Sequence, residues 1–249
     1  MINLPKHVLD RRVWNAKSYG KVCAGTLTAV TNMGLLDKTK NVIDVGAAAG
    51  LLSTYFAKNS NHVYCYEPSP SYLQTQKIAE QFNNVTTYNF AVSDFKGTAE
   101  FFIDDRRLSQ NGFLNPGWGK PVQVKTIKLD DQGHENIGFI KIDTEGTELD
   151  VLHGAEELIK QDKPAFMIEI WDQHKKYPLN NIFEYMEELG YKCYWYWFKN
   201  KQIIECQTVS KAVADAQLED YPHDADFIFV HNSKSVSDYT TCLISPVTP

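Results

Sequence analysis

The chain has 249 residues, of which 43% are hydrophobic and 22% are charged. This length and balance allow one substantial hydrophobic core, so we expect one elaborated domain rather than two. The formal net charge of −6 argues against sequence-independent binding of nucleic acid, because such binding depends on basic surfaces that attract the phosphate backbone.

The cysteines are odd in number, widely spaced and without a C-x-x-C pair, which is typical of reduced thiols in a cytoplasmic protein. They are Cys23, Cys65, Cys193, Cys206 and Cys242. No long apolar stretch follows the basic residues at the amino terminus, so the sequence predicts neither a signal peptide nor a membrane span. We expect a cytoplasmic protein with neither nucleic acid nor a membrane as its partner.

Three parts are expected in chain order. Residues 1–40 are mixed in character, and residues 22–36 have helical apolar spacing, which predicts an N-terminal helical extension against the core. Residues 41–231 carry the alternating strands and helices of the main domain. Residues 232–249 are rich in Ser and Thr and predict a surface tail.

The stretch 41–50 is a short apolar strand that breaks into small residues before a helix at about 51–58. Gly46 and Gly50 allow the backbone to turn sharply and to approach a ligand closely. The first turn of the following helix would offer free N–H groups to an anionic ligand group. A second short strand, 62–67, ends in Glu67, where a carboxylate can accept hydrogen bonds from both ribose hydroxyls of a nucleoside.

The next elements predict further parts of the same sheet. A helix is expected from about Pro70 to Phe82, and residues 85–92 predict a third strand. Asp94 follows that strand, so it is a candidate partner for an adenine amine, with a turn-forming role as the alternative. Residues 97–103 and 122–127 predict an antiparallel pair, and the long loop between them suits an acceptor-binding lid or a plain surface excursion.

The fourth core strand, 138–142, ends in Asp143. Leu149, Leu152, Ala155 and Leu158 then repeat at helical spacing, which predicts one helix with Glu145 in its first turn. Residues 165–170 predict the fifth strand, and His174 lies in the loop after it. The last strands are expected at 191–198, 202–206 and 226–231, with the first and last of these as an antiparallel pair at a sheet edge.

This alternation predicts an α/β fold with a doubly wound, mostly parallel, Rossmann-like sheet whose last strand is antiparallel. Such sheets bind ligands at the carboxyl ends of their strands. A dinucleotide fingerprint is absent, because Ala48 and Leu51 stand where its second and third glycines would be. The observed D-x-G-x-x-x-G suits a cofactor without a pyrophosphate, and S-adenosylmethionine fits best.

The sequence resembles the FkbM family of S-adenosylmethionine-dependent methyltransferases over residues 41 to about 170. The most specific block is KIDTEGTE at 141–148. The other matching blocks are 42–47, 66–68, 89–94, 126–130 and 151–155. Two departures are Ala48, where the family often has a polar residue, and Leu129, which usually comes one position earlier.

The resemblance implies a class I methyltransferase fold and methyl transfer, mostly to hydroxyl groups of sugars, glycans or polyketide-like metabolites. It implies that the methionine portion lies beside the glycine turn and that Asp44 orders this turn or contacts the cofactor's ammonium. Lys141 is expected to be a buried ion-pair partner. The implied cofactor-binding residues are Asp44, Gly46, Ala47, Gly50, Glu67, Pro68, Asp94 and Asp143.

Asp143 and His174 are the candidate catalytic residues. The alternatives are that Asp143 only caps the following helix and that His174 is an ordinary surface histidine. Asp143, Glu169, Asp172 and His174 could converge on Mg²⁺, but no short-spaced ligand motif supports a metal site, and a metal-independent enzyme is favoured.

The preferred function is O-methylation of a small-molecule or glycan acceptor. An N-methyltransferase for protein or nucleic acid is the first alternative. The acidic composition and the absence of an Asn/Asp-Pro-Pro-Tyr block after the fourth strand count against methylation of nucleic-acid bases. A non-catalytic, cofactor-binding interaction subunit is the second alternative.

Overall fold

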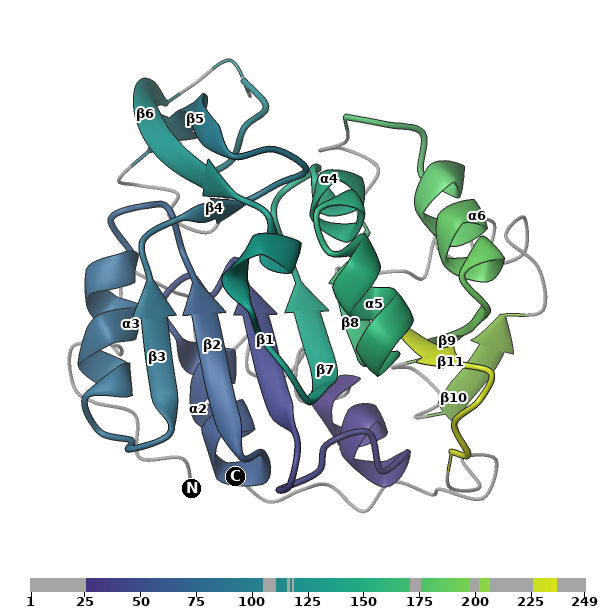
Figure 1. The fold of residues 1–249 in the computed structure, drawn as a ribbon. Helices are drawn as coiled ribbons and strands as arrows, with labels where there is room; N and C mark the ends of the chain where they lie inside the picture. The colour runs from purple at the N-terminus through teal and green to yellow at the C-terminus, as the bar shows by residue number, and fades with distance from the viewer. Residues whose placement is uncertain are drawn as a thin grey trace.

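The computed structural model describes residues 26–104, 111–115, 117, 119–170, 176–197, 202–206 and 226–236. Within them, one large sheet has the strand order β10-β9-β11-β8-β7-β1-β2-β3 (Figure 1). Its strands are β1 (Asn41–Val45), β2 (His62–Tyr66), β3 (Val85–Tyr88), β7 (Ile137–Ile142), β8 (Ala165–Glu169), β9 (Tyr191–Trp197), β10 (Gln202–Cys206) and β11 (Asp226–His231).

The five strands from β8 to β3 are parallel to their neighbours, whereas β11 is antiparallel to both β8 and β9. The doubly wound, mostly parallel sheet with an antiparallel last strand is therefore confirmed. The β9–β11 pair was predicted correctly, but β10 continues the sheet beyond β9, so the outer edge belongs to β10.

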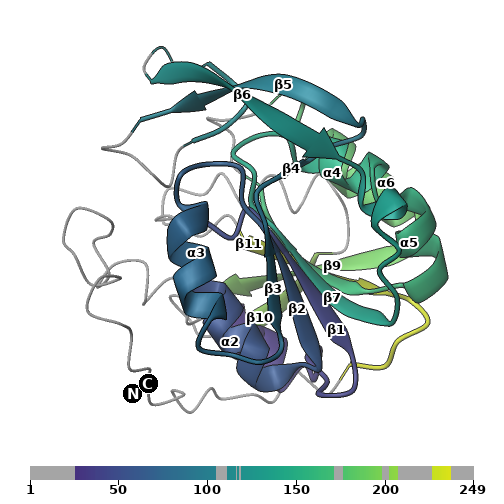
Figure 2. The same ribbon diagram turned by 60° about the vertical axis from the view of Figure 1, so that its left-hand side comes forward.

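Helices cover both faces of this sheet (Figure 2). One face carries α2 (Leu51–Asn59) and α3 (Tyr72–Ala79), and the other carries α4 (Glu148–His153), α5 (Glu156–Asp162) and α6 (Asn180–Glu188). Residues 26–32 are helical, and Ala29 and Val30 pack in the α2 layer with Leu52 and Phe56. None of the helices in the described part of the chain combines the length and apolar character needed to cross a bilayer.

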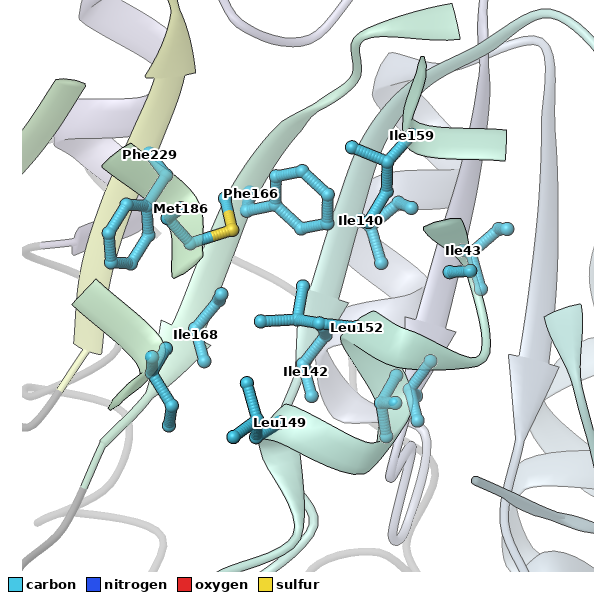
Figure 3. Packing of buried hydrophobic residues seen from close by; sticks show 14 of the residues in the cluster. Ile43, Ile140, Ile142, Leu149, Leu152, Ile159, Phe166, Ile168, Met186 and Phe229 are labelled. Carbon is cyan, nitrogen blue, oxygen red and sulfur yellow. The ribbon is translucent and has the colours of Figure 1, made fainter. Parts of the chain in front are cut away.

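Alternation along each central strand builds two separate cores. Ile43, Ile140 and Phe166 point to the α4–α6 side, where they pack with Leu152 and Met186 (Figure 3). Their chain neighbours, such as Val42, Phe139 and Ala165, point to the α2 side. Because side chains alternate faces, Asp44 and Lys141 also lie on the α2 side. The register of β1 against β7 places these two residues directly beside each other.

A smaller sheet lies beyond the carboxyl ends of the main strands (Figure 1). It has the order β4-β6-β5 and consists of β4 (Ala91–Val92), β5 (Gly97–Ile103) and β6 (Lys120–Ile127). A short 3₁₀ helix, η2 (Leu129–Gln132), follows β6. The predicted antiparallel pair is thus present, and it belongs to a separate layer over the site-bearing edge.

The third predicted strand, 85–92, is wrong as a single element. β3 ends at Tyr88, and residues 91–92 pair with β6 in the small sheet instead. Asn89 makes the break, because its Nδ2 donates to the backbone oxygen of Glu67 at 2.9 Å and turns the chain out of the main sheet. The helix predicted from Pro70 is also shorter than expected, since α3 spans Tyr72–Ala79.

The single helix predicted around residues 149–158 is two helices. A Cβ on Gly154 would lie 2.0 Å from the Ser93 carbonyl oxygen, so only glycine lets the small sheet approach here. The Asp130 carboxylate accepts hydrogen bonds from the backbone N–H groups of Glu157 and Leu158, which lets α5 restart after the break. Glu145 is not in a first helical turn: it has φ 57° and precedes α4.

Candidate functional site

The turn after β1 requires glycine at its first position. Gly46 has φ 73°, and a Cβ there would lie 1.8 Å from the carbonyl oxygen of Asp143. The N–H groups of Gly46 and Ala47 both donate to the Tyr66 carbonyl at 3.0 Å, which ties the turn to the end of β2. Gly50 has φ 76° and precedes α2, so the predicted strand–turn–helix cradle is present. The backbone of the turn therefore contacts the ends of both neighbouring strands.

Glu67 shapes the same turn from the other side. One carboxylate oxygen accepts from the Ala48 N–H at 2.7 Å, and the other accepts from the Ser69 N–H at 2.8 Å. Burial raises the pKa of Glu67, although these hydrogen bonds act in the opposite direction. Ser69 also makes a side-chain hydrogen bond to Glu67, so three of the four lone pairs of the carboxylate are engaged and one remains for a ligand.

A buried ammonium group joins the ends of β1 and β7. Lys141 Nζ lies 3.2 Å from Asp143 Oδ2 and 3.6 Å from Asp44 Oδ1, and it donates to the Gly46 carbonyl at 2.7 Å. The other Asp44 oxygen accepts from Ser53 Oγ of α2 at 2.6 Å. The expectation of a buried ion pair at Lys141 is confirmed, and the contacts of Asp44 are those of a residue that orders the turn.

Burial and the neighbouring charges have opposite effects on the pKa values of Lys141 and Asp44. Burial disfavours the charged form of Lys141, but the nearby Asp143 and Asp44 outweigh it and raise the pKa of Lys141. Burial also raises the pKa of Asp44, with Lys141 and the Ser53 hydroxyl acting against that rise. Lys141 is therefore held as a cation beneath the turn.

Three carboxylates gather at the ends of β7 and β8. Asp143, Glu145 and Glu169 each offer an oxygen, and these oxygens all lie within 4.8 Å of one another. All three side chains are half-buried. Burial, followed by the negative charges of Asp143, Glu145 and Asp226, raises the pKa of Glu169 well above its ordinary value. A proton on Glu169 is thus retained more strongly than on an isolated glutamate.

Only two of the four possible Mg²⁺ ligands named from the sequence are found together in the described part of the chain. The structure brings Asp143 and Glu169 together and adds Glu145, whereas Asp172 and His174 lie outside the described residues. Carboxylate oxygens are of the kind that Mg²⁺ takes, but the Lys141 ammonium already supplies a positive charge to Asp143. A metal-independent site remains the favoured interpretation.

Glu148 stabilises the loop after Asp143 through hydrogen bonds. Its Oε1 accepts from the Thr144 N–H, the Thr144 hydroxyl and the Gly146 N–H, at 3.0–3.1 Å. Burial is the main influence on this carboxyl, and it raises the pKa of Glu148 to about 7 against the effect of the hydrogen bonds. The positive φ of Glu145 and Gly146 fits this tight loop. Glu148 belongs to the block singled out in the sequence, but its role depends on contacts that spacing does not reveal.

Two further contacts hold other segments against the site. The backbone N–H of Lys176, just beyond β8, donates to the Gly146 carbonyl at 2.9 Å, and Lys176 Nζ lies 2.9 Å from the buried Asp150. From the small sheet, Gly112 approaches the Glu145 side chain, since a Cβ on Gly112 would lie 3.3 Å from the Cβ of Glu145. The loop between β5 and β6 therefore reaches Glu145, while its role in acceptor binding stays a prediction.

The other predicted residues have different surroundings. Ala47 packs in the α2-side core, and Pro68 is half-buried beside Glu67. Asp94 follows β4 rather than a strand of the main sheet; its side chain is exposed and accepts from Ser93 Oγ at 3.2 Å. Asp94 was predicted to follow the third strand of the main sheet. Asn89 lies at that position instead, directly after β3, and the sequence analysis did not name it as a site residue. His174 lies outside the described residues, so its role stays a prediction.

The model of the methyltransferase FkbM domain family matches residues 44–193. The chain belongs to the FkbM methyltransferase family. The FkbM match begins at Asp44 and spans Glu67, Asp143, Glu148 and Glu169, which lie at or just after the carboxyl ends of β1, β2, β7 and β8. It lies inside the predicted domain of residues 41–231. No curated protein matches the chain.

Solved structures include two that are similar to this FkbM chain at low identity. The methyltransferase FkbM from Methylobacillus flagellatus KT is 16% identical, with a TM-score of 0.48 over 88% of this chain and 56% of that chain. This chain therefore spans little more than half the length of that protein. SMU.1697c from Streptococcus mutans, in complex with SAH, is 12% identical, with a TM-score of 0.47 over 82% of this chain and 94% of that chain.

Proposed function

We propose that this FkbM-family chain is an S-adenosylmethionine-dependent methyltransferase that methylates a hydroxyl group of a sugar, glycan or small metabolite. The observation that carries the proposal is the juxtaposition of the Gly46 turn, Glu67 and Asp143 at the carboxyl ends of three adjacent strands. In a doubly wound sheet this edge is the place where ligands bind.

The residues present fit the methyl donor. Gly46 and Gly50 leave both ends of the turn without side chains, and Glu67 keeps a lone pair for a ribose hydroxyl. S-adenosylmethionine supplies a methyl group that its sulfonium already makes electrophilic, so the chain's task is to align the acceptor oxygen and to take its proton.

The half-buried carboxylates favour oxygen as the acceptor atom, because a hydroxyl must lose its proton during methyl transfer. Asp143 is engaged by the Lys141 ammonium at 3.2 Å. Glu169 lies in the same cluster, and its raised pKa suits a group that accepts the proton. His174 is the second candidate for this role, as predicted from sequence.

Calorimetry with S-adenosylmethionine tests the donor, followed by assays against a panel of hydroxylated acceptors. Saturable binding and methyl transfer to at least one hydroxyl are the expected results. Absence of binding at millimolar cofactor would contradict every methyltransferase version of the function. Binding without turnover across the panel, together with tight association with another protein, would indicate a cofactor-binding subunit instead. Transfer to an amine rather than a hydroxyl would replace O-methylation by N-methylation.

Once an acceptor is known, single-turnover rates separate the two candidate bases. Glu169→Gln should slow methyl transfer at least tenfold with cofactor affinity unchanged, because it removes a proton acceptor but no predicted cofactor contact. Glu135→Gln, at an exposed position, is the matched control. A large effect of His174→Gln with no effect of Glu169→Gln would assign the role to His174.

A further inference from the structure

Two cysteines face each other across the outermost strand pair of the main sheet. The register of β9 against β10 makes Cys193 and Cys206 direct antiparallel partners, and both side chains are half-buried. The Cys193 thiol is hydrogen-bonded to Cys206. Directly opposed residues on antiparallel strands have Cβ atoms about 4.5–5.5 Å apart, close to the roughly 3.5–4.5 Å of a disulfide.

We propose that Cys193 and Cys206 form a redox-active dithiol that takes up an intramolecular disulfide by exchange with a small-molecule disulfide. The pair is a modification site separate from the carboxylate cluster, and the proposal does not depend on the proposed function. β10 is the outer strand of the sheet order, so the pair lies at an edge rather than among the central strands (Figure 1).

Comparison with Cys65 shows what distinguishes the pair. Cys65 is fully buried in the α2-side core, and the register of β2 places it beside Asp44 on one side and Thr87 on the other. Cys65 therefore has neither a thiol partner in the neighbouring strands nor access to solvent, and we expect it to stay reduced.

The exchange proceeds in two steps. The Cys206 thiolate attacks one sulfur of the small disulfide, forms a mixed disulfide and releases one small thiolate. The Cys193 thiolate then attacks the Cys206 sulfur, forms the protein disulfide and releases the second small thiolate. The two cysteine protons pass to the two released thiolates, so two protein thiols are oxidised and one small disulfide is reduced. We place Cys206 in the first step because it belongs to β10, the outer strand of the sheet, and Cys193 in the second, resolving step.

The disulfide would cross-link the two outermost strands without altering their register. It would close the segment between Cys193 and Cys206 and attach β10 covalently to β9, in the register that they already have. Because cross-linking reduces the freedom of the unfolded chain, the oxidised protein should melt about 5 °C higher than the reduced protein.

The test uses the full chain with Cys23→Ser and Cys242→Ser, which leaves three cysteines. The folded protein is equilibrated in buffers of reduced and oxidised glutathione, unreacted thiols are alkylated, and peptides are mapped by mass spectrometry. The expected product is a peptide pair joined through Cys193 and Cys206, with Cys65 alkylated only after unfolding. Separate alkylation of Cys193 and Cys206 at every ratio, with no joined peptide, would overturn the proposal.

A register control distinguishes native pairing from chance proximity. Cys206→Ser combined with Glu205→Cys moves the thiol by one residue, and successive side chains of a strand point to opposite faces. This variant should form no disulfide with Cys193 in the folded protein. Equal disulfide formation in this variant would contradict the register on which the proposal depends. A lower melting temperature on oxidation of the Cys193 and Cys206 pair would contradict the expected stabilisation by a disulfide in this register.

Discussion

Gly46 and Asp143 touch backbone to backbone, although nearly a hundred residues separate them in the chain. Any Cβ on Gly46 would lie 1.8 Å from the Asp143 carbonyl oxygen, far inside van der Waals contact. The turn that cradles the cofactor and the loop that carries the candidate catalytic carboxylate are therefore packed as one unit.

Gly46→Ala should lower the free energy of unfolding by about 3 kcal/mol or more, because it adds a steric clash to the strain of φ 73°. Gly133→Ala is the matched control: Gly133 has φ 65°, but a Cβ there meets nothing within 4 Å. It should cost only about 1 kcal/mol of backbone strain. Chemical denaturation of both variants measures the difference, and equal losses would mean that the contact with Asp143 is unimportant.

Glu67→Gln should weaken S-adenosylmethionine binding at least tenfold. The amide offers only one acceptor oxygen where two backbone N–H groups now donate, so the turn loses one of its hydrogen bonds and places two donors together. Calorimetry gives the affinity, and circular dichroism checks the fold. Glu80→Gln, an exposed change at the end of α3, should leave the affinity unchanged. Unaltered binding in Glu67→Gln would remove Glu67 from the cofactor site.

Lys141→Met should destabilise the fold by about 3–5 kcal/mol, because Asp44 and Asp143 would lose the ammonium that lies between them. The same replacement at Lys160, which is half-exposed and pairs with Glu156 and Glu157, should have no measurable effect on unfolding. Thermal and chemical denaturation compare the two variants. A stable Lys141→Met protein would show that the fold does not depend on the ion pairs of Lys141.

Glu148 should make the fold less stable as pH rises from 4.5 to about 7. Its pKa is raised from 4.5 to about 7 in the folded protein, mainly by burial, so the folded state binds the proton more tightly than the unfolded state in this window. The resulting stability is present in full below pH 4.5 and is lost as pH rises through 7, on the order of 3 kcal/mol in total.

Glu148→Gln should remove this contribution from the pH profile. All three donors meet a single oxygen, Oε1, so the amide oxygen can accept them without rearrangement. Urea denaturation at pH 5 and pH 8 measures the change, with the exposed Glu188→Gln as the control. An unchanged slope in Glu148→Gln would assign the pH dependence to another group.

Much of the main sheet was predictable because its signals are local. The apolar run before Gly46, the strand ending beside Glu67 and the strand leading to Asp143 each show their type within a few residues. The positions of these residues at one edge then follow from the rule that parallel strands share a direction.

The errors lie where partners distant in sequence compete with local preference. Residues 85–92 have strand character throughout, but Val92 pairs with Ile127 of the small sheet and not with the main sheet. The helix after Asp143 breaks at Gly154 because the Ser93 carbonyl occupies the space beside it. No local pattern contains either contact.

The sequence by itself determined most of the order of strands and helices, the glycine turn and the acids that end the strands, because backbone preference and alternation act over a few residues. Only the tertiary structure decided that Asp44 and Asp143 share the ammonium of Lys141, that Glu145 and Glu169 join Asp143, and that Cys193 faces Cys206. These relationships depend on strand register and on close packing, which bring together side chains that the chain itself keeps far apart.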